Sequence, residues 1–384
     1  MSNVIPMVIA ARVLSADGLG TFALCVALVI LCLGLVRAMV SEPFLVSPDW
    51  EDLAPALPRA AAYAGACLSL VLIVAASIAW SVNSSIHACL FTAAICAPGA
   101  AAFDALRMVA IKASSPKTAF LIDTAWVVFT CGALFAADTM SREMPEYLLI
   151  AWLAPPTAIA FVVLLASRRT SPFASAISTL HRLKRQGTRY CVDYFMGFGS
   201  QQIGGILLVA VLSIADLGDY RLSLTWYGPI GILFAGVSPL LVADLSTRTE
   251  HHSGHRLLVI SSICLATASV AYCLASLNFP ILTLLILGDA AGPRLTPLLL
   301  PVGAAFALNA FAVGATIGLR SQARTSDLLR VRFYTAPLSI ALPPLGAHYD
   351  GIAGAGWGLA IAAALSSTLY WHRFRRPPTR PLPS

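Results

Sequence analysis

A succession of long apolar runs is the feature that most constrains this chain. Apolar runs bounded by charged or turn residues divide it into twelve segments: 2–14, 19–40, 60–82, 85–111, 117–138, 145–167, 188–214, 219–245, 255–276, 294–319, 326–347 and 351–371. A transmembrane helix needs about 20 apolar residues, and all but the first segment reach that length. The run 279–288 is too short to cross a membrane. The sequence therefore predicts an all-α fold, a polytopic membrane protein with about twelve transmembrane helices.

The small supply of charged residues excludes most other classes of protein. Charged residues make up 11% of the chain, against about 25% in soluble domains. So few charges cannot cover a water-exposed surface, which excludes a soluble enzyme, a nucleic-acid-binding protein and a secreted disulfide scaffold. The nine cysteines lie in apolar runs without metal-site spacing, so we interpret them as small apolar residues. We expect no metal, no cofactor and no enzymatic activity.

The few cations sort unequally between alternate loops. If the twelve segments cross the membrane, 21 of the 25 Lys and Arg residues fall on one side. Only Arg12, Arg142, Arg221 and Arg294 fall on the other. Because Lys and Arg gather in cytoplasmic loops, this bias predicts a multi-pass protein of the cell membrane with both termini in the cytoplasm. The net charge of +7 is then a consequence of topology rather than of ligand binding.

A short match indicates that the chain contains an internal repeat. The sequence ADGLGTF at 16–22 follows the first segment, and ADLGDY at 215–220 follows the seventh. Six spans in each half, joined by the most basic loop, are typical of a parallel-repeat transporter. We predict an N-terminal six-helix lobe at 1–167, a basic cytoplasmic linker at 168–187, a C-terminal six-helix lobe at 188–372 and a disordered cytoplasmic tail at 373–384.

The repeat also bears on the first segment and on the linker. The first segment has 13 residues, too few to cross a hydrocarbon core of about 30 Å. We therefore expect that the first helix is truncated, either by a misassigned start codon or in the protein itself. In 171–187, apolar residues recur at helical spacing among cations, which predicts a helix lying along the membrane surface.

Polar residues inside the predicted spans are the candidate site residues, because polar groups in hydrocarbon are costly and mark functional sites by default. They are Arg37, Asp104, Arg107, Asp123, Asp193, Gln201, Gln202 and Asn309. Asp104 and Arg107 are three residues apart on one helix and can pair, and Asp123 could join them from the next helix. The group either lines a polar cavity for a charged head group or a coupling proton, or it is an ion pair that holds two helices together.

For the other candidate residues, a structural role and a role in lining a cavity both stay open. Glutamine and asparagine within spans either join helices or line a cavity, and Arg37 either lines that cavity or extends to the lipid head groups. Prolines interrupt several spans, and Gly228-Pro229 in the eighth is the most suggestive, because broken helices beside a cavity are typical of transporters. We find no Walker, dinucleotide, nucleophile-elbow or zinc-protease motif.

Four short segments carry a resemblance to a known family. ARVLSADGLGTFAL at 11–24 ends the first helix, and SEPFLV at 41–46 follows the second. The eighth segment holds Gly228-Pro229 and Ser238-Pro239, and LGD at 287–289 precedes the tenth. These segments resemble the polysaccharide flippases, the O-antigen and teichoic-acid exporters of the multidrug/oligosaccharidyl-lipid/polysaccharide superfamily. The resemblance extends over nearly the whole chain, and its motifs are structural rather than catalytic.

The resemblance implies two six-helix lobes around a central cavity that opens alternately to either face of the membrane. It implies an undecaprenyl-diphosphate-linked oligosaccharide as cargo, for the biosynthesis of lipopolysaccharide or another surface polysaccharide. Substrate-binding candidates are then Arg37, Arg107, Gln201, Gln202 and Asn309, and coupling candidates are Asp104, Asp123 and Asp193. Expected partners are the lipid-linked oligosaccharide, membrane lipids, a polysaccharide polymerase and glycosyltransferases, with no nucleic acid.

Three other interpretations stay open. A multidrug or cation antiporter of the same superfamily would share the architecture, although acidic cation-site residues in the early helices are not evident. A membrane-embedded polysaccharide polymerase or glycosyltransferase would need a sizeable outer loop, whereas 138–145 is among the longest here. A non-transporting paralogue would account for the short first helix.

Overall fold

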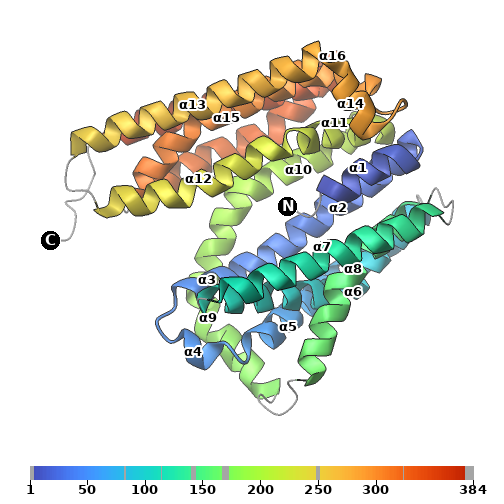
Figure 1. The fold of residues 1–384 in the computed structure, drawn as a ribbon, viewed down its shortest axis with the longest axis vertical. Helices are drawn as coiled ribbons and strands as arrows, with labels where there is room; N and C mark the ends of the chain where they lie inside the picture. Colours follow the sequence, from blue (N-terminus) through green and yellow to red (C-terminus); the bar gives the residue numbers. More distant parts are fainter. Residues whose placement is uncertain are drawn as a thin grey trace. The chain divides into compact units, whose positions relative to one another are not determined.

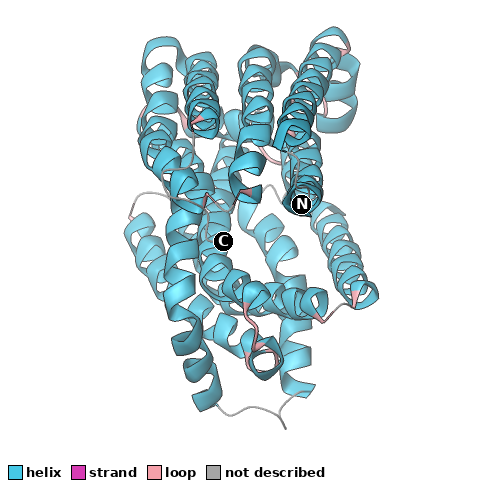
Figure 2. Ribbon diagram, turned by 90° about the vertical axis from the view of Figure 1, so that its left-hand side faces the viewer, coloured by secondary structure: helices cyan, strands magenta, loops and turns pink. Residues whose placement is uncertain are grey.

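The computed structural model describes residues 4–81, 84–113, 115–139, 144–166, 173–247, 251–322 and 324–376. Within these ranges the chain consists of helices and short turns, without a strand (Figure 2). The predicted all-α fold is confirmed. The chain divides into two compact units between Phe195 and Met196, and we call them the N-terminal and the C-terminal unit.

The N-terminal unit combines long apolar helices with shorter elements. Its elements, coloured from blue to green in Figure 1, are α1 (Val4–Val13), α2 (Ala16–Val36), the π-helical turn η1 (Arg37–Ser41), α3 (Glu42–Val46), α4 (Trp50–Leu53), α5 (Leu57–Trp80), α6 (Ser84–Lys112), α7 (Pro116–Thr139), α8 (Pro145–Ala166) and α9 (Phe173–Tyr194). The predicted first span corresponds to α1, an apolar helix of 10 residues.

The alanine-rich helix α6 is the packing centre of the N-terminal unit. Its small side chains allow α5 and α8 to approach closely, as is typical between helices in a membrane. Hydroxyl groups reinforce these contacts: Ser69 Oγ donates to the carbonyl of Ala94 at 2.6 Å, and Thr157 Oγ1 donates to that of Cys96 at 3.1 Å. The unit is thus held by close backbone approach and by hydrogen bonds between helices.

The segment predicted to lie along the membrane surface forms most of α9. One face of this helix packs on the N-terminal unit, where Ala176 and Leu183 are buried together with Phe44 and Leu57. The opposite face exposes its cations, namely His181, Arg182, Lys184, Arg185 and Arg189. The apolar spacing therefore reflects packing against protein, although Ile177 is exposed. The side chain of Phe173 and residues 168–172 lie outside the described part.

The C-terminal unit also combines long helices with short helical elements. Its elements are the rest of η2 (Phe195–Gly199), α10 (Ser200–Leu207), the short η3 (Leu208–Ala210), α11 (Ile214–Trp226), α12 (Gly228–Thr247), α13 (His251–Asn278), α14 (Pro280–Leu287), the short η4 (Pro293–Leu295), α15 (Thr296–Ser321) and α16 (Thr325–Arg375). The short apolar run 279–288 forms α14, consistent with its being too short to span.

Two helix breaks shape the C-terminal unit. The predicted eighth span is broken between α11 and α12 directly before Gly228-Pro229. Hydrogen bonds anchor this junction, because Tyr227 Oη donates to the carbonyl of Leu299 and Tyr272 Oη donates to that of Trp226. The predicted eleventh and twelfth spans correspond to the two helical halves of α16, which are separated at Asp350–Gly351, where the backbone is not helical. Gly351 has φ 55°, a conformation that favours glycine.

The two units begin an equivalent helix in the same way. Ser15 caps α2 by accepting a hydrogen bond from the backbone N–H of Gly18 at 3.2 Å. Ser213 caps α11 by accepting one from the N–H of Asp216 at 3.1 Å. The short sequence match therefore coincides with one local structure in both halves, a serine N-cap before a helix that starts with an acidic first turn.

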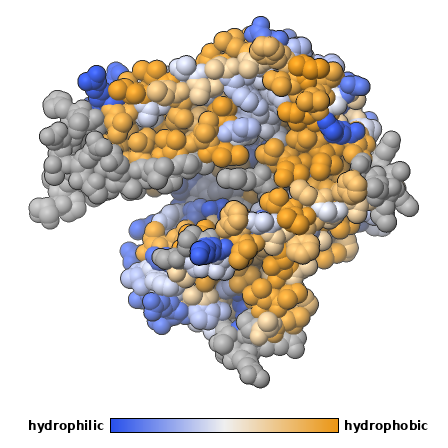
Figure 3. All heavy atoms as spheres, in the orientation of Figure 1, coloured by the Kyte–Doolittle hydropathy of each residue, from blue (hydrophilic) through white to orange (hydrophobic). Residues whose placement is uncertain are grey.

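Eight helices of the described residues are long and apolar enough to cross a membrane. One of them, Ser326–Arg375, contains two of the predicted spans, and α1 is shorter than a span. Several of these helices expose large apolar side chains, such as Leu70 and Ile78 on α5 and Phe120 and Phe135 on α7. Figure 3 shows apolar residues over much of the face it displays. Such a surface suits lipid rather than water.

Candidate functional site

Four of the predicted site residues form one chain of ion pairs in the N-terminal unit. Asp104 Oδ1 lies 3.1 Å from Arg107 Nη2 and 3.9 Å from Arg37 Nη1, and Arg107 Nη1 lies 3.7 Å from Asp123 Oδ1. We call these residues, Arg37, Asp104, Arg107 and Asp123, the N-terminal charged cluster. The prediction that Asp123 joins the pair on the preceding helix is confirmed, and Arg37 joins as well.

These side chains come from three elements of the N-terminal unit, η1, α6 and α7. Asp104 and Arg107 share one face of α6 because they are three residues apart, and α7 returns directly from α6 to place Asp123 beside them. Arg37 opens η1, a π-helical turn. Such turns are rare and frequently mark functional sites, because they rotate the following side chains out of the α-helical register.

The N-terminal charged cluster is half-exposed and loosely paired. The exposed fractions of its side chains are 43% for Arg37, 27% for Asp104, 23% for Arg107 and 44% for Asp123. Of the three ion pairs, only Asp104–Arg107 is also a hydrogen bond, and Asp104 Oδ2 is buried without a hydrogen-bond partner among the described residues. The guanidinium groups thus keep donors that a ligand could use.

Asp193 and the glutamines that share its predicted span belong to different units. Asp193 lies near the end of α9 in the N-terminal unit, whereas Gln201, Gln202 and Asn309 belong to the C-terminal unit. The two glutamines also have different surroundings. Gln202 is buried, and its side-chain oxygen accepts a hydrogen bond from Arg221 Nη1 at 2.5 Å, while its carbonyl accepts one from Arg221 Nη2 at 3.1 Å. For Gln202 the structure thus favours the interpretation as a contact between helices.

Gln201 and Asn309 line one cavity of about 290 Å³ inside the C-terminal unit. We call it the C-terminal cavity, and α10, α12, α15 and both halves of α16 contribute to its wall. Its described polar lining residues are Ser200, Gln201, Asn309, Thr316, Arg332, Thr335, Ser339, Ser366 and Tyr370. One of these carries a positive charge, and none carries a carboxylate. The described wall of the cavity therefore combines polar and apolar side chains and carries one charge, that of Arg332.

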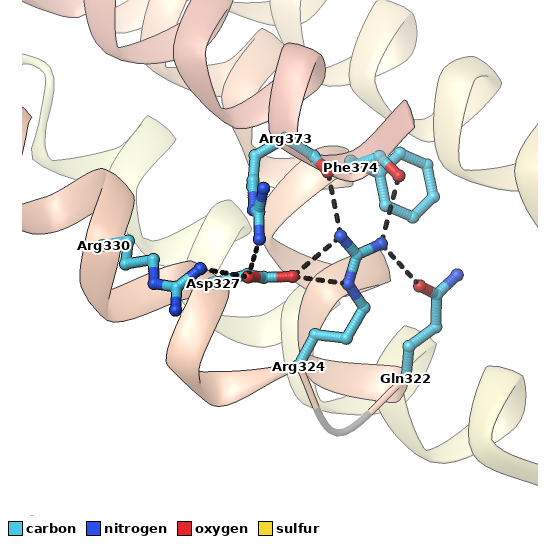
Figure 4. A network of polar contacts seen from close by, with 6 residues as sticks. All are labelled: Gln322, Arg324, Asp327, Arg330, Arg373 and Phe374. Atoms are coloured by element: carbon cyan, nitrogen blue, oxygen red, sulfur yellow. Dashed lines mark hydrogen bonds and ion pairs between the residues drawn. The ribbon is translucent and has the colours of Figure 1, made fainter. Parts of the chain in front are cut away.

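A second charged group, shown in Figure 4, lies in the C-terminal unit and is compact and buried. Asp327 Oδ2 accepts a hydrogen bond from Arg324 Nε at 2.8 Å, and Asp327 Oδ1 pairs with Arg373 and, at 4.0 Å, with Arg330. The exposed fractions are 6% for the Arg324 side chain, 3% for Asp327 and 16% for Arg373. We call Arg324, Asp327 and Arg373 the C-terminal clasp.

The clasp joins the two ends of α16. Arg324 also donates to the backbone carbonyls of Arg373 at 3.0 Å and Phe374 at 3.3 Å, near the end of that helix. Carbonyls in a last helical turn have no partner within the helix, so this guanidinium satisfies them. With the donors of Arg324 engaged by protein, the clasp has the properties of a structural element rather than of a ligand site.

Sequence reasoning missed Arg332 and the clasp, because it assigned all of these cations to basic loops. A signal for Arg332 was present: Arg332, Thr335 and Ser339 recur at spacings of three and four, which places them on one face of a helix. Arg221 and Arg294, counted on the opposite side, also have partners within the protein, since Arg294 Nε lies 3.6 Å from Asp219. Arg142 lies outside the described residues.

The described residues also bear on the expectations for metal binding and for the cysteines. The described residues contain no group of three His, Cys, Asp or Glu side chains placed to hold a metal ion. All nine cysteines are free thiols. Cys25, Cys32, Cys89, Cys96 and Cys273 are buried, in agreement with their interpretation as small apolar residues in the helix packing.

The fold resembles two solved transporter structures over almost the entire chain. The lipid II flippase MurJ in an inward closed conformation matches with a TM-score of 0.71 at 10% identity, covering 97% of this chain and 84% of that one. A multidrug resistance MATE family transporter of the MOP superfamily, in an inward-facing conformation, matches with a TM-score of 0.69 at 11% identity, covering 97% and 93%. No protein-family model and no curated protein matches the sequence. The chain therefore shares the fold of these two solved structures.

Proposed function

We propose that the protein is a membrane transporter that moves a lipid-linked oligosaccharide across the cell membrane by alternating access. The observation that carries this proposal is the fold shared with a lipid II flippase over 97% of the chain. The apolar exterior of its long helices supports an integral membrane location. The cargo would be an undecaprenyl-diphosphate-linked oligosaccharide used in the biosynthesis of lipopolysaccharide or another surface polysaccharide.

Within this proposal, the N-terminal charged cluster supplies the cations that bind the diphosphate. Arg37 and Arg107 are half-exposed and retain donors, and guanidinium groups match the geometry of phosphate oxygens. Gln201 and Asn309 contact the cargo from the C-terminal cavity. Gln202 has no place in this set, because its side chain binds Arg221 inside the protein.

The same proposal assigns coupling to carboxylates. Asp104 and Asp123 each lie within 4 Å of a guanidinium of the cluster, so a proton or cation that binds either of them changes the charge that a diphosphate would meet. Asp193, on α9 of the same unit, is the third coupling candidate. Binding of the coupling ion and binding of the cargo would thereby be linked.

Two further proposals concern topology and partners. The sorting of Lys and Arg supports a cytoplasmic location of both termini, and reporter fusions at each end would test it. The proposed cargo requires glycosyltransferases that assemble the lipid-linked oligosaccharide and a polymerase that uses it on the other side. Neither enzyme needs a catalytic contribution from this chain.

A multidrug or cation antiporter is the main alternative, and the similar TM-scores of the two neighbours do not separate it. Charge does. A cationic drug is recognised by carboxylates and aromatic faces, whereas the described wall of the C-terminal cavity carries Arg332 and no carboxylate. This charge balance favours an anionic or polar cargo.

The test is a leaflet assay with the purified protein in liposomes. We expect movement of a fluorescent undecaprenyl-diphosphate-linked oligosaccharide from one leaflet to the other, faster than in empty liposomes. A cationic dye in the same vesicles should not be transported. Transport of the dye without movement of the lipid-linked sugar would overturn the proposal in favour of the antiporter, and movement of neither would favour a non-transporting paralogue.

A further inference from the structure

We propose that the exposed face of α9 binds the head groups of anionic phospholipids in the leaflet that this helix borders. The inference does not depend on the cargo, so it goes beyond the proposed function. It follows from what α9 exposes, from the pairing of its cations, and from the place where α9 packs. We call this surface the α9 basic face, and it comprises Ile177, His181, Lys184, Arg185, Arg189 and Val192.

The two opposite sides of α9 have different surroundings. The exposed residues 177, 181, 185 and 189 recur every four positions, and Val192 follows three positions later, so they lie on one side of the helix. The residues buried on the other side are Ala176, Thr179, Leu183 and Gly187. At Gly187 the contact with η1 is so close that a Cβ would clash with the carbonyl oxygen of Met39. The N-terminal unit thus covers one side of α9 and leaves the α9 basic face open.

Three cations of this face are not engaged within the described part of the chain. The side chains of Lys184, Arg185 and Arg189 are exposed, and none of them forms an ion pair or a side-chain hydrogen bond with another described residue. Arg182, which adjoins the face, pairs with Asp49 at 3.1 Å. Residues 173–192 contain no carboxylate, and the first that follows is Asp193. An anion that approaches the face therefore meets three positive charges, whose N–H groups can donate to phosphate oxygens.

The position of α9 brings these charges to the boundary of the apolar helices. The buried side of α9 packs against η1 and α3, which end the apolar stretch Ala16–Val46, and against Leu57, at the start of α5. The ends of transmembrane helices lie at the depth of the lipid head groups. A helix that packs across such ends presents its open side at the same depth, where lipid phosphates are found.

Apolar residues at both ends of the face favour a lipid over a soluble polyanion. Ile177 is 46% exposed and Val192 is 43% exposed, and the cations lie between them. A soluble polyanion offers charge alone, whereas a phospholipid surface offers phosphates and, beneath them, acyl chains. Helices at a membrane surface combine Lys and Arg with apolar residues for this reason, and clusters of cations beside a transmembrane helix bind anionic lipids.

Titration of the purified full-length protein with lipids in detergent tests the inference without any transport. Native mass spectrometry counts bound molecules of phosphatidylglycerol and of phosphatidylcholine, which differ in the charge of the head group. We expect phosphatidylglycerol to bind about tenfold more tightly or better, because each cation near an anionic lipid adds to the attraction. The combined substitution Lys184→Gln, Arg185→Gln and Arg189→Gln should remove this preference. Ile177→Ser should weaken the binding of phosphatidylglycerol by removing an apolar contact.

The matched control removes three exposed cations of the C-terminal unit by combining Arg256→Gln, Arg375→Gln and Arg376→Gln. It lowers the net charge of the protein by the same amount and should leave the preference intact. The exchange of Lys for Arg and of Arg for Lys at positions 184, 185 and 189 keeps the charge and should also leave it intact. All of these side chains are exposed, so thermal unfolding should stay that of the wild type.

Three results would overturn the inference. The wild type could bind both lipids equally, or the two triple variants could lose the preference to the same extent, which would indicate attraction by net charge alone. Glycerol phosphate or polyglutamate could bind as tightly as phosphatidylglycerol, which would indicate a site for soluble anions. Leaflet transport of the cargo is a separate readout, so the lipid site and the proposed function can fail independently.

Discussion

The N-terminal charged cluster and the C-terminal clasp contain the same types of residue, but they differ in burial and in pairing. In the cluster, Arg37, Asp104, Arg107 and Asp123 are half-exposed, and most of their separations exceed hydrogen-bond length. In the clasp, Asp327 is almost fully buried among guanidinium groups, and Arg324 is bound to carbonyls as well. The difference separates charges that remain available to a ligand from charges that stabilise the fold.

The difference in burial predicts different contributions of the two groups to the stability of the fold. An exposed ion pair contributes about 0–1 kcal/mol to stability, whereas removal of one partner from a buried pair costs about 3–5 kcal/mol, because the other charge remains buried without compensation. If the comparison is correct, substitutions in the cluster affect transport and leave stability almost unchanged. Substitutions in the clasp should do the reverse.

Asp327→Asn should have the largest effect on stability. It leaves Arg324 and Arg373 buried without a counter-charge, so we expect a loss of about 3–5 kcal/mol in the free energy of unfolding. The matched substitution in the cluster, Asp104→Asn, should cost about 1 kcal/mol or less. Thermal unfolding of both variants in the same detergent measures the difference. Equal losses of unfolding free energy in the two variants would mean that the cluster and the clasp contribute equally to stability, and this would contradict the comparison.

Asp123→Asn tests the coupling role that we propose for the cluster. The substitution removes a carboxylate 3.7 Å from Arg107 and keeps the shape of the side chain. We expect the transport rate to lose its response to an imposed proton or cation gradient, while the protein stays folded. Transport that still follows the gradient would remove Asp123 from the mechanism and would leave Asp104 and Asp193 as candidates.

Ser15→Ala and Ser213→Ala compare the two units at their most similar point. Each substitution removes the side-chain acceptor of a helix N-cap, on α2 and on α11. The expected loss is about 1 kcal/mol in each case, measured by the same unfolding assay. A much larger loss for one of them would indicate that the two caps, despite their common sequence, have different tertiary contacts.

Local sequence relationships predicted the contacts among Asp104, Arg107 and Asp123 in the cluster, but they could not predict that Arg373 joins Arg324 and Asp327 in the clasp. Asp104 and Arg107 are one helical turn apart, and Asp123 follows on the next helix, so the sequence alone brings them together. Arg324 and Arg373, in contrast, are 49 residues apart and meet because α16 folds back at the kink beside Gly351. The break itself was expected between the predicted spans 326–347 and 351–371, but the spacing of residues does not show which side chains meet across it.

The C-terminal cavity was predicted in part. Gln201 and Asn309 stood out because amides are costly within apolar runs, and both line it. Arg332 was assigned to a loop on charge alone, although its helical spacing with Thr335 and Ser339 indicates a polar face. Gln202, adjacent to Gln201, binds Arg221 instead, because neighbouring positions on a helix point in different directions.

The most direct test of the account compares Arg107→Gln with Arg182→Gln. Each substitution removes an Arg–Asp pair of 3.1 Å from the N-terminal unit, and Arg107→Gln also removes the 3.7 Å pair with Asp123. Arg182 and its partner Asp49 lie on an exposed surface outside the cluster. The measurement is the initial rate at which the lipid-linked oligosaccharide changes leaflet in liposomes that contain equal amounts of folded protein. The account predicts a loss of about tenfold or more for Arg107→Gln, as expected when a charged hydrogen bond to the cargo is removed, and a wild-type rate for Arg182→Gln. Equal rates for the two variants would contradict it.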